Sequence, residues 1–292
     1  MNSSATFLNQ QHYCSSYAGV GEPGQTKVLL DNTYNFKLCI FFNNFERKMK
    51  VIKNDKIAEL VGLSFGDGSL TRRKDCGVLR FQLRGNVTED RDHYQDYIIP
   101  LFNTYISQLL LNRNVPLVES KYPYASFGIA IQNNTVGEFL SQLGIPIGRK
   151  GELKIPSWIK EDKNYLSSFI RGVFDTDGSV FCKRNYSIKN NQKHTQIKLK
   201  IVTVSKNLAF ELKESLDKLT IKNYIKIQYK EKDKDAYHVE VSGGINVEKW
   251  FKIIGSNNPK HILKVLNIRT ITSTFVYTNV IKYIRKLITF SI

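Results

Sequence analysis

The stretches LVGLSFGDG, residues 60–68, and IRGVFDTDG, residues 170–178, decide how this chain folds. Each is an apolar run of helical character that contains a glycine, ends in an aspartate followed by a second glycine, and then gives way to strand-like residues. A glycine inside a helix costs about 1 kcal/mol relative to alanine, and a carboxylate at a helix C-terminus faces the negative end of the helix dipole. Both costs indicate that the pattern serves a purpose.

The two stretches occupy equivalent places in an internal duplication. The same sequence distance separates Gly62 from Gly172 and Asp67 from Asp177. Around each stretch, hydrophobic periodicity predicts elements in the order α-β-β-α-β-β-α. We therefore expect an α+β fold made of two pseudo-symmetric αββαββα halves.

The periodicity also gives the expected ranges of these elements. In the first half we expect helices at 55–66, 94–111 and 135–143, and strands at 78–84, 117–121 and 126–132. In the second half we expect helices at 165–174, 208–219 and 247–254, and strands near 179–182, 195–204, 224–230 and 237–241. A further helix is expected at 273–289.

Composition along the chain suggests five segments. Residues 1–50 are rich in Asn, Ser, Gln and Gly and are an N-terminal extension of unknown role. The first half is expected at 51–144 and the second at 163–270, with a Gly- and Pro-containing linker at 145–162 and a C-terminal helix within 271–292.

The charge of the chain favours a polyanionic partner. Lys and Arg number 43 against 26 Asp and Glu, which gives a net charge of +17. No apolar run reaches the roughly 18 residues of a membrane span, so we expect nucleic acid rather than a membrane. The four cysteines form no CxxC pair and the N-terminus lacks signal-peptide features, so we expect an intracellular protein, in the cytoplasm or nucleoid or in an organelle.

Both stretches resemble the LAGLIDADG motif of homing endonucleases, in the single-chain form that carries two motifs. Small residues at Gly62 and Gly172 allow two helix backbones to approach closely, so the two helices would form the interface between the halves. Each helix would then deliver one aspartate, Asp67 or Asp177, to a shared point. A plain helix end with a C-cap glycine is the alternative explanation for either copy alone, and the duplication weakens it.

Two carboxylates that meet at unfavourable helix ends call for a cation. Hard oxygen ligands suit Mg²⁺, and we expect two or three divalent ions shared between Asp67 and Asp177, with Gly66 and Thr176 in the same metal site. Asp175 is different because its counterpart in the first half is Phe65. We expect Asp175 to be solvated or to cap a helix, and not to bind metal.

The resemblance also implies one lysine near the active centre from each half. Lys150 and Lys260 lie at the same sequence distance after Asp67 and Asp177, respectively, and are assigned with them to catalysis. Such a lysine could polarise the scissile phosphate or tune the attacking water. A solvated lysine is the alternative in so basic a chain, and Lys154 competes with Lys150 for the role.

Three expected strands carry a polar face suited to a groove of DNA. By the period of two, basic and amide side chains alternate with apolar ones. The expected DNA-binding residues are Arg80, Gln82, Arg84, Gln196, Lys198, Lys200, Lys226, Gln228 and Lys230. Arg and Lys can read guanine and Gln can read adenine, while other basic groups contact phosphates. An ordinary solvated sheet face is the alternative.

The family implies that the antiparallel sheets form a DNA-binding saddle. The function that follows is a monomeric, metal-dependent endonuclease that cuts both strands of a long, nearly asymmetric DNA site and leaves 3′ overhangs, encoded by a mobile intron or a free-standing gene. An RNA maturase that binds its host intron is the main alternative, and a DNA-binding regulator without catalysis is a third. The two intact aspartates argue against the third.

Overall fold

The structure is a computed structural model that describes residues 53–120, 126–186, 193–231 and 233–270. The expected N-terminal extension at 1–50 and the expected helix at 273–289 lie outside the described residues. Both predicted halves belong to one compact unit that begins at Lys48. Among the residues that the structure describes, no helix is long and apolar enough to cross a bilayer.

The first half follows the predicted element order. Its elements are α2 (Asp55–Gly66), β1 (Gly68–Arg72), β2 (Leu79–Gly85), α3 (Arg91–His93), η1 (Tyr94–Ile98), α4 (Ile99–Phe102), η2 (Asn103–Ser107), α5 (Gln108–Leu111), β3 (Val118–Ser120), β4 (Ser126–Gln132) and α6 (Asn134–Gln142). The helix expected at 94–111 is therefore a continuous helical run with two π segments, η1 and η2. Pro100, which has no N–H to donate, is the second residue after the first π segment.

The second half repeats this order and adds two helices. Its elements are α7 (Ser157–Lys160), α8 (Lys163–Asp177), β5 (Gly178–Tyr186), β6 (Lys193–Thr203), α9 (Lys206–Lys218), β7 (Asn223–Gln228), β8 (Ala236–Ser242), α10 (Gly244–Ile253) and α11 (Pro259–Thr270). The short helix α7 lies in the predicted linker, and α11 was not predicted. The strand expected to reach Lys230 ends at Gln228, so Lys230 lies beyond it.

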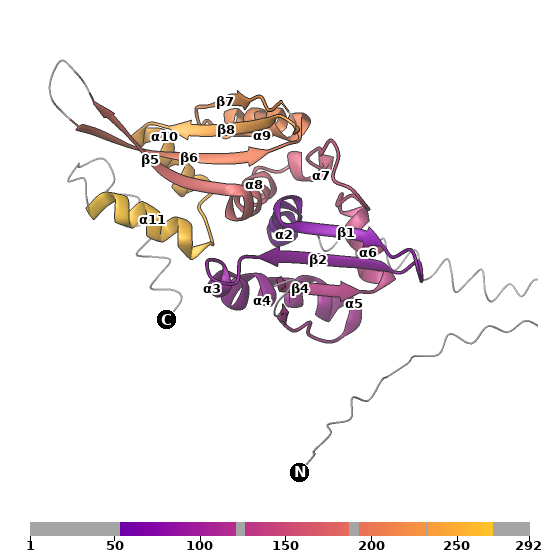
Figure 1. Cartoon of the computed structure of the whole chain (residues 1–292). Coiled ribbons are helices and arrows are strands. Elements are labelled where there is room, and N and C mark those ends of the chain that lie inside the picture. Colours follow the sequence, from indigo (N-terminus) through magenta and orange to yellow (C-terminus); the bar gives the residue numbers. More distant parts are fainter. Residues whose placement is uncertain (1–52, 121–125, 187–192, 232, 271–292) are drawn as a thin grey trace, which may run out of the picture. The chain divides into compact units, whose positions relative to one another are not determined.

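Both sheets are antiparallel and have the same strand order. The first is β1-β2-β4-β3 and the second is β5-β6-β8-β7. In each sheet the apolar side chains are buried against helices: α6 packs on β2 in the first half, and α9 and α10 pack on β6 and β8 in the second (Figure 1). The predicted α+β class and the duplication are confirmed.

Helices α2 and α8 join the two halves. Each begins with a polar cap: the Asn54 side chain accepts from the backbone N–H of Ile57, and the Asp162 side chain accepts from the backbone N–H of Tyr165. Where the helices cross, the rings of Phe65 and Phe169 meet edge to face with centroids 5.2 Å apart. This contact packs the C-terminal part of α2 against the middle of α8.

Backbone contact at the crossing requires glycine on both helices. A Cβ atom on Gly62 would lie 2.2 Å from the backbone oxygen of Phe169. A Cβ atom on Gly172 would lie 2.3 Å from the backbone oxygen of Glu59. Any side chain at either position would therefore force the helices apart.

Candidate active site

The C-terminal ends of α2 and α8 meet at the predicted metal site. Asp67 is the C-cap residue of α2, and Asp177 is the last residue of α8. A Cβ atom on Gly66 would lie 1.9 Å from the hydroxyl oxygen of Thr176 and 3.4 Å from the carboxyl carbon of Asp177. The structure thus brings together all four residues assigned to metal from the sequence.

The carboxyl groups of Asp67 and Asp177 both have raised pKa values. Burial, the charge of Asp177 and the charge of Asp90 raise the pKa of Asp67 to about 7. Burial raises the pKa of Asp177 to about 6, against the opposing charge of Lys150. Within the described part of the chain, neither carboxylate accepts a hydrogen bond or forms an ion pair. Bound divalent metal would supply the missing positive charge.

The donor set around these carboxylates fits Mg²⁺. Among the described residues, no three His, Cys, Asp or Glu side chains gather in a way that could hold a metal. A site with two carboxylates, completed by backbone oxygens, water and substrate phosphate, is a usual arrangement for Mg²⁺. The hydroxyl of Thr176 donates within its own helix, to the backbone oxygens of Gly172 and Val173. The hydroxyl proton of Thr176 is therefore already used in hydrogen bonds within α8.

Lys150 lies directly at the meeting point of the helices. Its ammonium group donates to the backbone oxygens of Phe65, at 2.7 Å, and Gly66. A metal at the Gly66 oxygen would have to share that atom with the lysine. Burial lowers the pKa of Lys150, while the charges of Asp177 and Asp67 oppose the shift. Lys154 is exposed, so of these two lysines it is Lys150 that lies at the centre.

Lys260 lies in the first turn of α11 and reaches a carboxylate of the opposite half. Its ammonium group is 2.7 Å from Oδ1 of Asp90, the residue before α3. Burial raises the pKa of Asp90, but the hydrogen bond from Lys260 and the other donors outweigh it and leave the pKa below its usual value. Asp90 was missed in the sequence because nothing near it in the chain indicates a partner so far away.

Asp175 is buried, and the expectation that it is solvated is wrong. The residue is 1% exposed, and its side chain accepts from the hydroxyl of Ser256 and, at 2.9 Å, from the backbone N–H of Asn257. Burial raises its pKa to about 7, against the hydrogen bond from Ser256. Its counterpart Phe65 is buried as well, because this helix position faces the protein interior in both halves.

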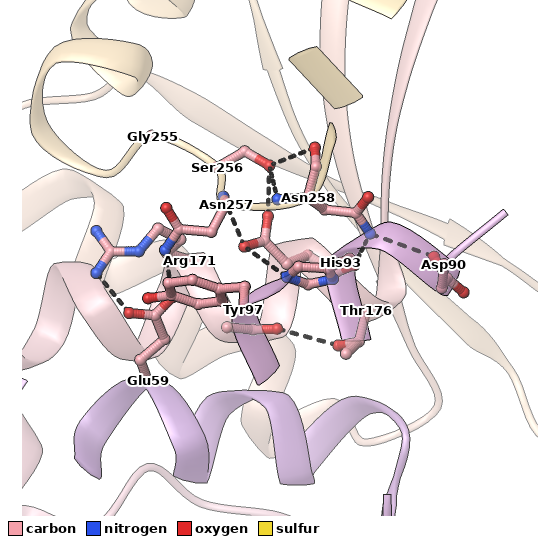
Figure 2. Close-up of polar contacts among 12 residues, drawn as sticks. Glu59, Asp90, His93, Tyr97, Arg171, Thr176, Gly255, Ser256, Asn257 and Asn258 are labelled. Atoms are coloured by element: carbon pink, nitrogen blue, oxygen red, sulfur yellow. Dashed lines mark hydrogen bonds and ion pairs between the residues drawn. The ribbon is translucent and has the colours of Figure 1, made fainter. Parts of the chain in front are cut away.

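A polar network surrounds Asp175 and joins the halves. Arg171 donates to Glu59 at 2.7 Å, and the Asn257 side chain donates to the other oxygen of Glu59 at 2.6 Å (Figure 2). Arg171 also donates to the backbone oxygen of Ile254. The loop between α10 and α11 is thereby fixed to both α2 and α8.

The predicted polar face of the first sheet lies on β2. Leu79, Phe81 and Leu83 are buried at 0–1% exposure. The alternate residues, which are the predicted DNA-binding side chains of this strand, are half-buried or exposed: Arg80, Gln82 and Arg84. The guanidinium of Arg84 donates to the side-chain oxygen of Gln82 at 3.0 Å, so these two side chains are already oriented together.

The second sheet has a matching face on β6 and β7. The predicted residues that the structure places on it are Gln196, Lys198, Lys200, Lys226 and Gln228, all at least partly exposed. Lys198 lies 5.9 Å from the ring centroid of Tyr224, and Lys200 lies 5.5 Å from that of Phe181. This face is therefore basic, and aromatic rings from β7 and β5, those of Tyr224 and Phe181, lie beside two of its lysines.

The sequence analysis missed two residues of this face, on β8. His238 pairs in register with Lys226, and Glu240 pairs with Tyr224, whose hydroxyl donates to the Glu240 carboxylate. The alternation of the stretch AYHVEVS, with buried Val239 and Val241, could have revealed them.

Comparison with known proteins supports the fold assignment. Residues 164–255 match the profile of a family described as a LAGLIDADG-like domain. Over 213 residues the chain is 25% identical to the replication factor C small subunit of Methanocaldococcus jannaschii, and over 221 residues it is 29% identical to the tRNA-splicing ligase RtcB of the same organism. These matches cover 68% and 72% of this chain but only 11% and 21% of the two proteins. The chain thus spans about a tenth and a fifth of their lengths, and neither activity carries over.

Solved structures share the fold of both halves. The crystal structure of I-DmoI in complex with DNA and Mn has a TM-score of 0.50 and 16% identity, and the match covers 69% of this chain and 96% of that one. A variant of I-DmoI with its target DNA and Mn has a TM-score of 0.50 and 15% identity, with 69% and 93% covered. At this identity the likeness establishes the fold. The second half therefore carries a LAGLIDADG-like domain, and the first half repeats its motif and strand order, in a fold shared with I-DmoI.

Proposed function

We propose that the protein is a site-specific DNA endonuclease that hydrolyses one phosphodiester bond in each strand with divalent metal ions. The observation that carries this proposal is the meeting of Asp67 and Asp177 at the ends of α2 and α8. No described residue neutralises either carboxylate by a direct contact, and a lysine lies beside them. I-DmoI, which shares the fold, is described as a homing endonuclease and was crystallised with DNA and Mn.

Different residues of the chain would have different roles in such a reaction. Asp67 and Asp177 would hold Mg²⁺, which supplies an activated water and stabilises the departing 3′ oxygen. Lys150 brings a positive charge that could stabilise charge developing on a phosphate at the same point. Because the central helix of each half ends at one aspartate, each half would serve one strand. We propose two or three ions and a staggered cut that leaves 3′ overhangs.

The basic sheet faces would bind the DNA on either side of the cut. The first face offers Arg and Gln on β2, and the second offers Lys, Gln and Tyr on β6 and β7. Because the two faces present different side chains, we propose that the target is nearly asymmetric and that one copy of the chain suffices to bind it. The double-stranded DNA would lie across both sheets, with backbone contacts to Lys and Arg and base contacts in the major groove.

Cleavage of the joined flanking sequence tests the proposal. DNA that carries the two sequences flanking this gene, joined without the insertion, is incubated with the protein in Mg²⁺ and in EDTA. We expect double-strand cleavage at one position in Mg²⁺, 3′ overhangs on mapping the ends, and no cleavage in EDTA. Asp67→Asn with the same DNA is the control for a contaminating nuclease.

The test also separates the alternative function. Binding of the host intron RNA with no DNA cleavage in Mg²⁺ would favour an RNA maturase, which assists splicing of its own intron. Binding of DNA without cleavage at any metal concentration would contradict the endonuclease proposal.

A further inference from the structure

The two lysines at equivalent sequence positions are held in different ways. Lys150 donates to backbone oxygens at the end of α2, those of Phe65 and Gly66. Lys260 donates instead to the carboxylate of Asp90. The pseudo-symmetry of the two halves is therefore broken beside the proposed active centre.

A buried asparagine explains why Lys260 takes the other position. The side-chain amide of Asn258, which is fully buried, donates at 2.9 Å to the backbone oxygen of Asp175. Asp175 is the counterpart of Phe65, so the amide occupies the place that the Lys150 ammonium occupies in the first half. The same amide donates at 3.3 Å to Oδ1 of Asp90 (Figure 2). Lys260 is thereby directed toward Asp90.

Asp90 is a buried hydrogen-bond acceptor whose carboxylate is already oriented by the backbone. It is 6% exposed, and the backbone N–H of Asn86 donates to its second oxygen at 3.0 Å. The backbone N–H of Lys260 donates to the side-chain oxygen of Asn258 at 3.1 Å, which fixes the start of α11. The lysine is thus held at its backbone by one half and at its ammonium group by the other.

The second half lacks this carboxylate. Asp90 precedes α3 as Ser205 precedes α9, so the two residues hold the same place in the element order. The Ser205 hydroxyl accepts from the backbone N–H of Leu153 at 2.8 Å and bonds to Glu152. It therefore fixes the linker and does not contact Lys150.

We propose that Asp90 is a positioning residue that fixes Lys260 and makes the two strand cleavages unequal. The cleavage that uses Lys260 depends on a carboxylate of the opposite half, and the cleavage that uses Lys150 does not. This inference rests on the proposed endonuclease function. Asp90 acts through the lysine and needs no contact with metal or DNA.

Strand-resolved kinetics on three variants test the proposal. Single-turnover cleavage of DNA labelled on each strand is measured for Asp90→Asn, Lys260→Met and the double variant. Asp90→Asn keeps the shape of the side chain but removes its charge. We expect both single variants to slow the same strand by about tenfold or more and to accumulate nicked DNA. We expect the double variant to be no slower than Lys260→Met, because both changes remove one interaction.

Two further variants separate positioning from loss of structure. Asp90→Glu keeps the charge and should restore part of the lost rate on the affected strand. Asp217→Asn is the matched control, because its carboxylate also pairs with a lysine, Lys213, but does so on the exposed face of α9. It should cut both strands like the wild type. Thermal melts of every variant show whether it is folded.

The possible results separate this inference from the proposed function. If the wild type cuts DNA, three results would show that the inference is wrong while the endonuclease function stands. Asp90→Asn could slow both strands equally, it could slow the opposite strand, or the rate loss of the double variant could equal the product of the two single losses. If the wild type cuts no DNA, the proposed function fails and the positioning role of Asp90 in cleavage fails with it. In that case additive melting-temperature shifts in the same double-mutant cycle would also refute the Asp90–Lys260 contact.

Discussion

Gly62 and Phe169 lie in direct backbone contact across the two central helices, since a Cβ atom on the glycine would come within 2.2 Å of the phenylalanine's backbone oxygen. The facing helix offers only backbone atoms there, and these cannot rotate aside. The glycine therefore fixes the distance between α2 and α8. That distance sets the spacing of the two aspartates at the helix ends.

Gly62→Ala should destabilise the protein although alanine is the better helix former. Overpacking costs about 1–3 kcal/mol and outweighs the gain in helix propensity of about 1 kcal/mol, so we expect a net loss of up to about 2 kcal/mol in the free energy of unfolding. Urea unfolding measures it. Gly151→Ala is the control, because nothing lies within 4 Å of a Cβ atom there. Wild-type stability in Gly62→Ala would show that the helices can separate at no cost.

Asp67→Asn and Asp177→Asn should each abolish double-strand cleavage and leave DNA affinity within about tenfold, or ~1.4 kcal/mol. Asparagine keeps the shape of the side chain but loses the charge that would hold the metal. Cleavage assays and filter binding in Ca²⁺ measure the two effects separately. Wild-type cutting rates in either variant would refute the metal assignment.

Lys150→Met should slow cleavage, and Lys154→Met should not. The ammonium group of Lys150 lies at the end of α2, whereas Lys154 is exposed in the same segment. Each variant replaces one lysine by methionine and loses one positive charge. The long-range electrostatic attraction to DNA is therefore reduced equally in both. Single-turnover rates on each strand are the measurement, and equal rates for the two variants would remove the catalytic role of Lys150.

Asp177→Asn should unfold at a higher temperature than the wild type in EDTA at pH 8. The pKa of Asp177 is raised from 3.8 to about 6 in the folded state, chiefly by burial. The folded state then binds the proton more tightly than the unfolded state, so stability falls as the pH rises from about 4 to about 6. The loss of stability caused by the ionised Asp177 carboxylate is fully present above that pH range and absent below it.

The pH and metal dependence provide the controls for this prediction. Near pH 4 the melting temperatures of Asp177→Asn and the wild type should approach each other. At pH 8, added Mg²⁺ should narrow the difference, because it binds and stabilises the wild-type native state. A variant that melts below the wild type at pH 8 in EDTA would mean that Asp177 makes net favourable contacts in the metal-free protein.

DNA binding should weaken steeply with salt, with a slope of log affinity against log salt of about −0.9 for each phosphate contacted. Arg80→Ala or Lys226→Ala should reduce that slope by about 1 or relax base preference. Lys213→Ala is the matched control, since Lys213 is an equally basic residue on α9, which packs against the apolar side of the second sheet. Salt-independent binding would exclude the basic faces as the DNA surface.

Local pattern in the sequence was enough to predict most of the secondary structure. The period of two in VLRFQLR, with buried Leu79 and Phe81, reflects one face packed on helices and one facing solvent. The duplication supports the same element order in both halves, because the pattern appears twice. The helix α11 escaped prediction because its apolar pattern is weak and its start is fixed by Asn258, whose partners come from distant parts of the chain.

Only those site residues that residue type and position in the repeat identify could be predicted from the sequence. Asp67, Asp177 and the two glycines follow from the repeated motif, because helix contact and charge at a helix end leave a signature within nine residues. Asp175 was misread because its burial depends on Ser256 and Asn257, which a loop some eighty residues away supplies.

By itself, the sequence determined the two-part fold, the pairing of the central helices and the location of the two aspartates. Tertiary structure alone decided what each lysine touches: Lys150 the backbone oxygens at the end of α2, Lys260 the carboxylate of Asp90. The physical reason is that helix and strand patterns are short-range and repeat in both halves. The partners of a buried charge, in contrast, are chosen by whichever donors and acceptors the folded chain brings within about 3 Å.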